Sequence, residues 1–171
     1  KLIKVAANSG ANAIKFQTYK SQTIYVENAG VCEYLSETNS NENINDLFEY
    51  LSMPHEMIPE LAKLCNEKNI HFMSTPFSVE DAKAVEPFVK IHKIASFEIN
   101  HVRLLEFLAK TGKPIILSTG ASTFDDIDFA VEYLKNNGCR NITLLQCTSK
   151  YPCPTESLNL QSCIKFMNIK H

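Results

Sequence analysis

The stretch GKPIILSTG, residues 112–120, places a short apolar run between a glycine and three small polar or flexible residues. Residues 114–117 have the apolar character of a buried strand, and Ser118, Thr119 and Gly120 follow at once. Gly112 lies where a preceding helix would end, because glycine adopts the backbone conformation that closes helices. The stretch therefore predicts a buried strand whose carboxyl end carries hydroxyl groups.

The residues that follow this strand have the pattern of an amphipathic helix. Thr123 and Asp126 have the spacing of a capping box at a helix start. Ile127 and Leu134 then recur on one helical face. A further apolar run at residues 142–145 predicts the next strand, so one complete strand–helix–strand unit is readable here.

The same alternation of strand and helix continues toward both ends of the chain. Each apolar run is short and nearly continuous, and a stretch of helical period follows it, which is typical of a parallel sheet covered on both faces. A doubly wound sheet and a (β/α)8 barrel are both compatible with this pattern. The strands expected from the sequence are residues 13–16, 71–74, 91–95, 114–117 and 142–145.

One segment, residues 20–51, interrupts the alternation. It is polar and is longer than the connections that compact domains usually contain. We expect a long loop after the first strand that acts either as a lid over a site or as a contact to another subunit.

The bulk composition excludes several classes of function. The 171 residues suffice for one domain, and the net charge of -2 offers no basic surface to nucleic acid or to an anionic membrane. No apolar run approaches the roughly 20 residues of a membrane span. The six cysteines form no CxxC pair, which favours reduced thiols in a cytoplasmic protein. Nucleotide-binding and hydrolase motifs such as GxGxxG, the Walker motif and GxSxG are absent from the sequence.

Polar residues follow the apolar core of each expected strand. In a parallel barrel the carboxyl ends of all strands open on one face, where ligands bind. Lys15 and Lys93 lie within apolar patterns, and a buried lysine requires a partner. Lysines and hydroxyls together suit a compact phosphate- or carboxylate-bearing ligand. The strand-end residues are Lys15, Gln17, Thr18, Ser74, Thr75, Lys93, Ser96, Glu98, Ser118, Thr119, Gln146, Thr148, Ser149 and Tyr151.

Simpler interpretations exist for some of these residues. Thr119 and Thr123 could be ordinary helix caps, and Glu98 could begin a surface helix. The five histidines form no HxH or HxxxH pair, so the sequence offers no metal-ligand spacing.

Five segments also resemble one known enzyme family, in its order along the chain. They are KFQT at 15–18, STPF at 74–77, KIASFE at 93–98, GKPIILSTG at 112–120 and LLQCTSKYP at 144–152. Together they resemble the sialic acid (N-acetylneuraminate) synthases, a family that includes pseudaminic and legionaminic acid synthases. Phe97 stands where neuraminate synthases often have glycine, which is closer to the pseudaminic type, and Gln146 stands where many relatives have histidine.

This resemblance implies the fold and the extent of the domain. Residues 1–171 would form part of a (β/α)8 TIM-type barrel, with about five βα units. The family's first strand would precede Lys1, and the C-terminal strands and the antifreeze-like domain would follow His171. We therefore expect the isolated chain to be inactive.

The resemblance also implies a reaction. A transferase of this family condenses phosphoenolpyruvate with an open-chain N-acylated amino sugar, such as N-acetylmannosamine, and releases phosphate. It uses a divalent metal, Mn or Mg, whose ligands would lie outside this chain, and it would act as a cytoplasmic homodimer. No nucleic acid or membrane partner is expected.

Site roles carry over to the matching positions. Glu98 and Lys93 would be catalytic, and Gln17 would contact the reacting centre or the sugar. Ser149 and Tyr151 would line the sugar pocket. The residues expected to hold phosphoenolpyruvate are Lys15, Thr75, Lys93, Ser96 and Ser118.

Two alternatives remain open from the sequence. The chain could belong to another phosphoenolpyruvate or phosphosugar barrel enzyme, such as an aldolase in which Lys93 forms a Schiff base. It could also be an inactive truncated barrel.

Overall fold

The computed structural model describes residues 1–27, 29–30, 43–150 and 152–166. The chain divides into two compact units, Lys1–Phe88 and Val89–His171. Each unit is described by itself below.

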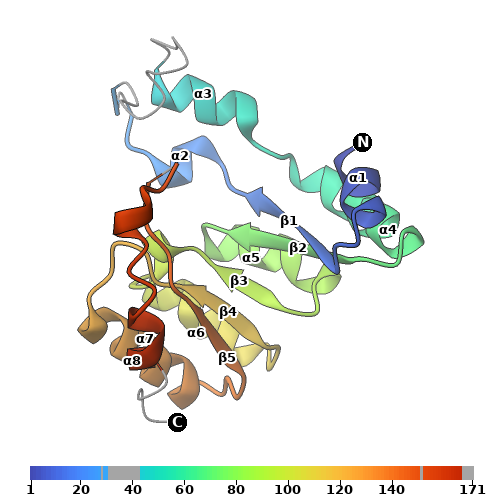
Figure 1. Ribbon diagram of the computed structural model, residues 1–171. Coiled ribbons are helices and arrows are strands. Elements are labelled where there is room, and N and C mark those ends of the chain that lie inside the picture. The colour runs from blue at the N-terminus through green and yellow to red at the C-terminus, as the bar shows by residue number, and fades with distance from the viewer. Residues whose placement is uncertain (28, 31–42, 151, 167–171) are drawn as a thin grey trace. The chain divides into compact units, whose positions relative to one another are not determined.

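The first unit is built on two parallel strands, β1 (Ala13–Thr18) and β2 (His71–Pro76) (Figure 1). Both strands were expected, and each runs two residues further than its apolar core. Thr18 Oγ1 and Ser74 Oγ share a buried hydrogen bond of 2.7 Å. This bond satisfies both buried hydroxyl groups, so the pairing of the two strands can continue through these polar residues.

Helices cover one side of this strand pair. Contacts join α1 (Leu2–Asn8) to β1, and both α4 (Ile58–Glu67) and α5 (Val79–Val85) to β2. The rings of Phe16 and Phe72 stack at 5.6 Å between neighbouring strands. The 3-10 turns η2 (His55–Met57) and η3 (Glu86–Phe88) adjoin α4 and α5.

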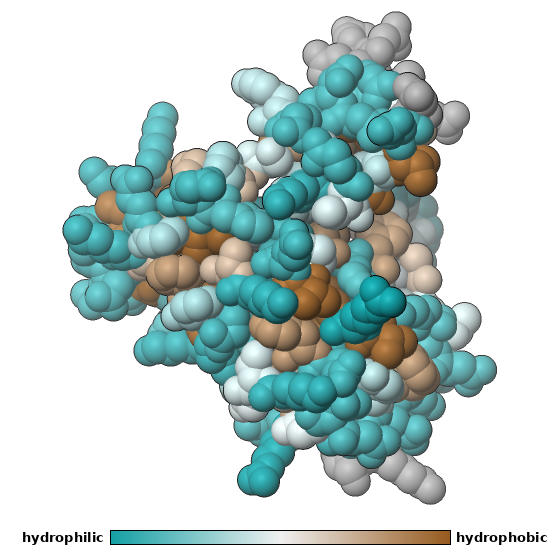
Figure 2. Space-filling model, turned by 180° about the vertical axis from the view of Figure 1, so that it is seen from behind, coloured by the Kyte–Doolittle hydropathy of each residue, from teal (hydrophilic) through white to brown (hydrophobic). Residues whose placement is uncertain are grey.

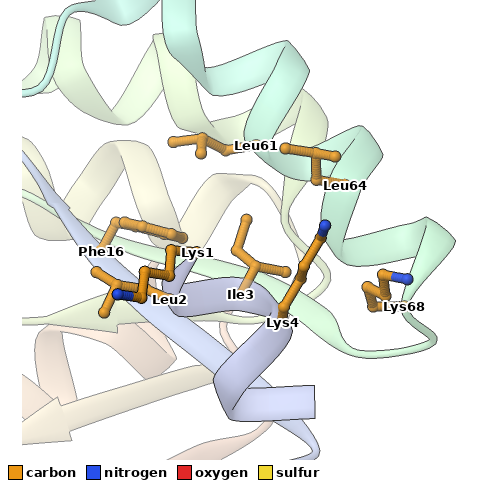
Figure 3. A pocket seen from close by; sticks show the side chains of 8 residues that line it. All are labelled: Lys1, Leu2, Ile3, Lys4, Phe16, Leu61, Leu64 and Lys68. Atoms are coloured by element: carbon orange, nitrogen blue, oxygen red, sulfur yellow. The ribbon is translucent and has the colours of Figure 1, made fainter. Parts of the chain in front are cut away.

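An apolar cavity of about 230 Å³ lies between α1, β1 and α4 (Figure 3). The ring of Phe16 lines it, so this residue faces the helices. Because side chains alternate along a strand, Lys15 and Gln17 point to the opposite face of β1. The residues that line the cavity are Lys1, Leu2, Ile3, Lys4, Phe16, Leu61, Leu64 and Lys68.

The segment expected to be one long loop instead includes two helices, α2 (Ser21–Ile24) and α3 (Ile44–Leu51). The side chain of Asn43 caps α3 by accepting a hydrogen bond from the Asn45 amide at 2.8 Å. Phe48 then packs against Tyr19 at 5.6 Å and Tyr25 at 4.8 Å. These aromatic contacts stabilise a short helix that the polar local sequence does not predict. Residues 28 and 31–42 of the segment lie outside the described residues.

The second unit contains three parallel strands in the order β3 (His92–Ile94), β4 (Ile115–Ser118) and β5 (Ile142–Leu145). All three were expected within two residues of these bounds. The strands neighbour one another in chain order, as successive right-handed βα units require.

Helices α6 (Val102–Lys110) and α7 (Phe124–Asn136) pack against each other in this unit. The predicted capping box of Thr123 and Asp126 is present at the start of α7. Ile94, Leu117 and Leu105 are fully buried in the core. The unit also contains the 3-10 turns η4 (Ser96–Glu98) and η5 (Thr155–Ser157) and the short helix α8 (Ser162–Phe166).

Figure 2 shows a mostly hydrophilic face on which hydrophobic side chains also reach the surface. No helix in the described part of the chain is long and apolar enough to span a membrane. The five cysteines among the described residues are free thiols: Cys65, Cys139, Cys147, Cys153 and Cys163.

Candidate functional site

In the first unit, three expected site residues share one face of the strand pair. Lys15 and Gln17 are two residues apart on β1, and Gln17 is paired with Thr75 on β2. Paired residues of parallel strands point to the same side. Lys15, Gln17 and Thr75 therefore lie on the face opposite the Phe16 cavity.

Lys15 is accessible to water, yet the surrounding protein partly desolvates its ammonium group, and this desolvation lowers the pKa of Lys15 below the ordinary value of 10.5. A nearby anion would favour the charged form and offset that loss of hydration. An anionic ligand at this position would therefore stabilise the charged form of Lys15.

Thr75 is almost completely buried, with 2% of its surface exposed. Its Oγ1 has no hydrogen-bond partner among the described residues. An unpaired buried hydroxyl costs roughly 1–3 kcal/mol, so an acceptor or donor supplied by a ligand would stabilise it.

In the second unit, the ammonium of Lys93 is fixed at the carboxyl end of the neighbouring strand. Lys93 is 7% exposed, and its Nζ donates to Ser118 Oγ at 2.6 Å and to the Ile94 carbonyl at 2.5 Å. Lys93 pairs with Ile116, two residues before Ser118, so all three side chains share a face of the sheet. Two of the residues expected to converge, Lys93 and Ser118, are therefore in direct contact.

Ser96, Gly120 and Ser149 form a second close group. The Gly120 amide donates to Ser96 Oγ at 2.9 Å. A Cβ at position 120 would lie 2.7 Å from Ser149 Oγ and 3.1 Å from Ser96 Oγ. A side chain here would force the Ser149 hydroxyl to move and would also crowd Ser96 Oγ and Cys147 Cβ, which would lie 3.3 Å from the new Cβ.

Glu98 has a partner that the sequence did not reveal. It lies in η4, and its Oε2 is 2.7 Å from His101 Nδ1; the two side chains are 17% and 34% exposed. In the sequence, His101 is one of five histidines without metal-ligand spacing. The signal that could have identified the pair is the spacing of three residues, which brings side chains together on one side of a helical turn.

The expected residues thus lie in both units, Lys15, Gln17 and Thr75 in the first and Lys93, Ser96, Glu98, Ser118 and Ser149 in the second. Their convergence on a single cavity stays a prediction. Tyr151 lies outside the described residues. Within the described ranges, no group of three or more His, Cys, Asp or Glu side chains could hold a metal ion.

Comparison with known proteins identifies the family. The sequence model described as "NeuB family" matches residues 2–169. The chain belongs to the NeuB family. Pairwise matches to NeuB proteins agree with this assignment and cover almost the whole chain.

Two curated relatives show the range of sugar acids in the NeuB family. The chain is 37% identical to the N,N'-diacetyllegionaminic acid synthase of Campylobacter jejuni, over 95% of this chain and 50% of the relative. It is 34% identical to the pseudaminic acid synthase of Helicobacter pylori, over 94% of this chain and 48% of the relative. The chain spans about half the length of the curated relatives it matches.

A solved NeuB-family structure agrees with the fold. The N-acetylneuraminic acid synthetase of Leptospira borgpetersenii, crystallised with citrate, matches 98% of this chain and 54% of its own, with a TM-score of 0.84 and 31% identity. The parallel strands and helices of this NeuB chain are part of a (β/α)8 TIM-type barrel, as expected. The doubly wound alternative is thereby excluded.

Proposed function

We propose that this chain is the central part of a nonulosonic acid synthase, which condenses phosphoenolpyruvate with an open-chain N-acylated amino sugar and releases phosphate. Membership of the NeuB family supports the class of enzyme. The observation that carries the proposal is the buried ammonium of Lys93, bonded to Ser118 at the carboxyl end of β4.

The two lysines would bind the anionic groups of phosphoenolpyruvate. Phosphoenolpyruvate carries a phosphate and a carboxylate, and the reaction releases the phosphate with its full charge. Fixed cations stabilise charge that grows in the transition state without having to reorganise. Lys93 has this fixed geometry, and Lys15 gains the anionic neighbour that its desolvated position favours.

The hydroxyls and the carboxylate have separate roles. Ser96, Ser118 and Thr75 would donate to the anion, and the unpaired Thr75 Oγ1 supports this role. Gln17, Ser149 and Tyr151 would contact the sugar or the reacting centre. Glu98 would exchange a proton with the reacting sugar, since a positioned carboxyl group can act as acid or base.

The described residues do not by themselves form a metal site. We propose that the ligands of a Mn or Mg ion come from outside this chain. We further propose that the complete protein acts as a cytoplasmic homodimer.

The test is product formation by the complete gene product. Phosphoenolpyruvate is supplied with N-acetylmannosamine or with diacetylated amino sugars, and phosphate release and the 2-keto acid product are measured together. Release of phosphate that requires the amino sugar supports the proposal. Phosphate release without a sugar acid product, or no reaction with any acylated amino sugar, would contradict it.

A Schiff-base aldolase would behave differently. Borohydride would trap a covalent adduct between Lys93 and a keto acid in such an enzyme. We expect no adduct, because Lys93 serves as a charged donor in the proposed site.

A further inference from the structure

We propose that His101 is a positioning residue for the catalytic carboxyl group of Glu98. This inference rests on the proposed function of Glu98. His101 is not among the residues proposed to bind the anion, and it lies outside the five segments that resemble the family.

Two hydrogen bonds link Glu98 and His101. Oε2 of Glu98 lies 2.7 Å from Nδ1 of His101, and the His101 amide donates to the Glu98 carbonyl at 3.0 Å. The second bond fixes the backbone between η4 and α6. The first fixes the direction of the carboxyl group.

Helix capping does not explain His101. The residue is the N-cap of α6, but its side chain makes no cap hydrogen bond. Residues favoured for capping are Ser, Thr, Asp and Asn, whose short side chains reach the helix amides. The imidazole instead turns to Glu98, which leaves orientation of that carboxyl group as its role.

One protonation arrangement lets Glu98 exchange a proton while its position stays fixed. When Nδ1 of His101 carries its hydrogen, Oε2 of Glu98 accepts from Nδ1–H whether or not the other oxygen, Oε1, is protonated. Glu98 can therefore give up or take a proton at Oε1 during the reaction while the bond from Nδ1–H to Oε2 remains.

The experiment compares four variants of the complete gene product: His101→Ala, His101→Asn, Glu98→Gln and the double variant Glu98→Gln/His101→Ala. His101→Ala removes the bond, and kcat should fall about tenfold while the KM for phosphoenolpyruvate changes less than about twofold. His101→Asn should restore most of kcat, because its amide nitrogen can occupy the place of Nδ1. The double variant should be no slower than Glu98→Gln alone, because His101 would affect the reaction only through Glu98.

The matched control is Glu106→Gln on the same helix. It removes a carboxylate from the exposed pair between Glu106 and Lys110, and kcat should stay at the wild-type value. Thermal melting of every variant separates loss of folding from loss of positioning. Wild-type kcat in His101→Ala would overturn the inference, as would equal losses in the Ala and Asn variants or additive losses in the double variant.

A measurement without turnover keeps this inference separate from the proposed function. Imidazole nitrogen NMR should show the His101 resonance change in Glu98→Gln, while the exposed His71 stays unchanged. If the complete protein makes no product, the proposed function fails and this spectrum alone tests the pairing. An unchanged His101 resonance would show that the pair does not exist.

Discussion

At the scale of single residues, two lysines occupy apolar strands and are held in different ways. Lys93 is buried and bonded to Ser118, whereas Lys15 is open to water with a pKa lowered by desolvation. The sequence pattern indicated that both were unusual. It did not distinguish them, because the difference depends on which neighbouring strand supplies an oxygen.

This difference leads to a prediction about the two residues proposed to be catalytic. Lys93→Ala should lose phosphoenolpyruvate affinity and turnover together, because the ammonium would bind both the ligand and the leaving phosphate. Glu98→Gln should lose mainly turnover, since the amide keeps the size of the side chain but cannot transfer a proton. Losses of about a hundredfold or more are expected, and steady-state kinetics on the complete protein measures them.

The control for these two variants is Lys110→Gln, an exposed lysine that takes part in a surface ion pair on α6. It should retain wild-type kinetics. Equal losses of affinity in the Lys93 and Glu98 variants would contradict the role of Glu98 in proton transfer. Wild-type rates for either variant would show that the substituted residue is not part of the site.

Gly120 gives a second prediction at this scale. Gly120→Ala should raise the KM for the amino sugar and lower the free energy of unfolding by about 1 kcal/mol, because the new methyl group displaces the hydroxyl of Ser149. Denaturant titration and initial rates measure the two effects.

A second substitution tests the cause. Ser149→Ala in the Gly120→Ala background removes the atom that lies 2.7 Å from the new Cβ, so part of the lost stability should return while sugar affinity does not; Ser96 Oγ at 3.1 Å and Cys147 Cβ at 3.3 Å still crowd the new methyl group. If stability is unchanged in the single variant, the close approach has no energetic consequence.

At the scale of elements, hydrophobic period and capping chemistry identified most strands and helices. The strands were placed within a few residues because their apolar cores are short and bounded by polar residues. Helix α3 was missed because its stability depends on Tyr19 and Tyr25, residues distant in sequence from Phe48. Local patterns cannot show a contact of this kind.

The capping box of α7 allows a prediction about stability. The Thr123 hydroxyl accepts from the Asp126 amide at 3.2 Å, and the Asp126 carboxylate accepts from the Thr123 amide at 2.8 Å. Thr123→Ala should lower the free energy of unfolding by about 1 kcal/mol. Ser122→Ala is the matched control, because its hydroxyl donates to Gly120 and does not cap the helix.

The stability that this capping box contributes depends on pH. Hydrogen bonds from the side chain and backbone of Thr123, and from Asn100, lower the pKa of Asp126 below 3.8. The contribution of Asp126 is therefore present above that value and is lost as the pH falls through the folded-state pKa. The Thr123→Ala variant should lose less additional stability on acidification below pH 4 than the wild type does; identical acid profiles would argue against the assignment.

At the scale of the whole molecule, the strands that the structure describes do not amount to a closed eight-stranded barrel. Large apolar side chains are exposed in both units, among them Leu2 and Tyr50 in the first and Leu160 and Ile164 in the second. The strand pattern predicted parallel βα units but left a doubly wound sheet and a barrel both open, and the family resemblance favoured the barrel. It did not predict the grouping of the strands into two compact units, because periodicity carries no information on contacts between distant segments.

We predict that residues 1–171 produced alone have no synthase activity, self-associate and bind a hydrophobic dye, whereas the complete gene product is active and binds little dye. Exposed apolar patches and open sheet edges are the physical reason. Light scattering, dye fluorescence and the product assay measure these properties. An active, monomeric chain of 171 residues would contradict the expectation.

The alternation along β1 also restricts how this protein can evolve. Lys15 and Gln17 face one side of the strand while Phe16 faces the apolar cavity, and the buried Thr18–Ser74 bond fixes the alignment with β2. A substitution at position 15 or 17 would change the face proposed to bind the ligand with little effect on the core. Gain or loss of a single codon within β1 would instead exchange the two faces, turning the lysine toward the cavity and the phenylalanine away from it. Homologues should therefore seldom differ in the length of this strand.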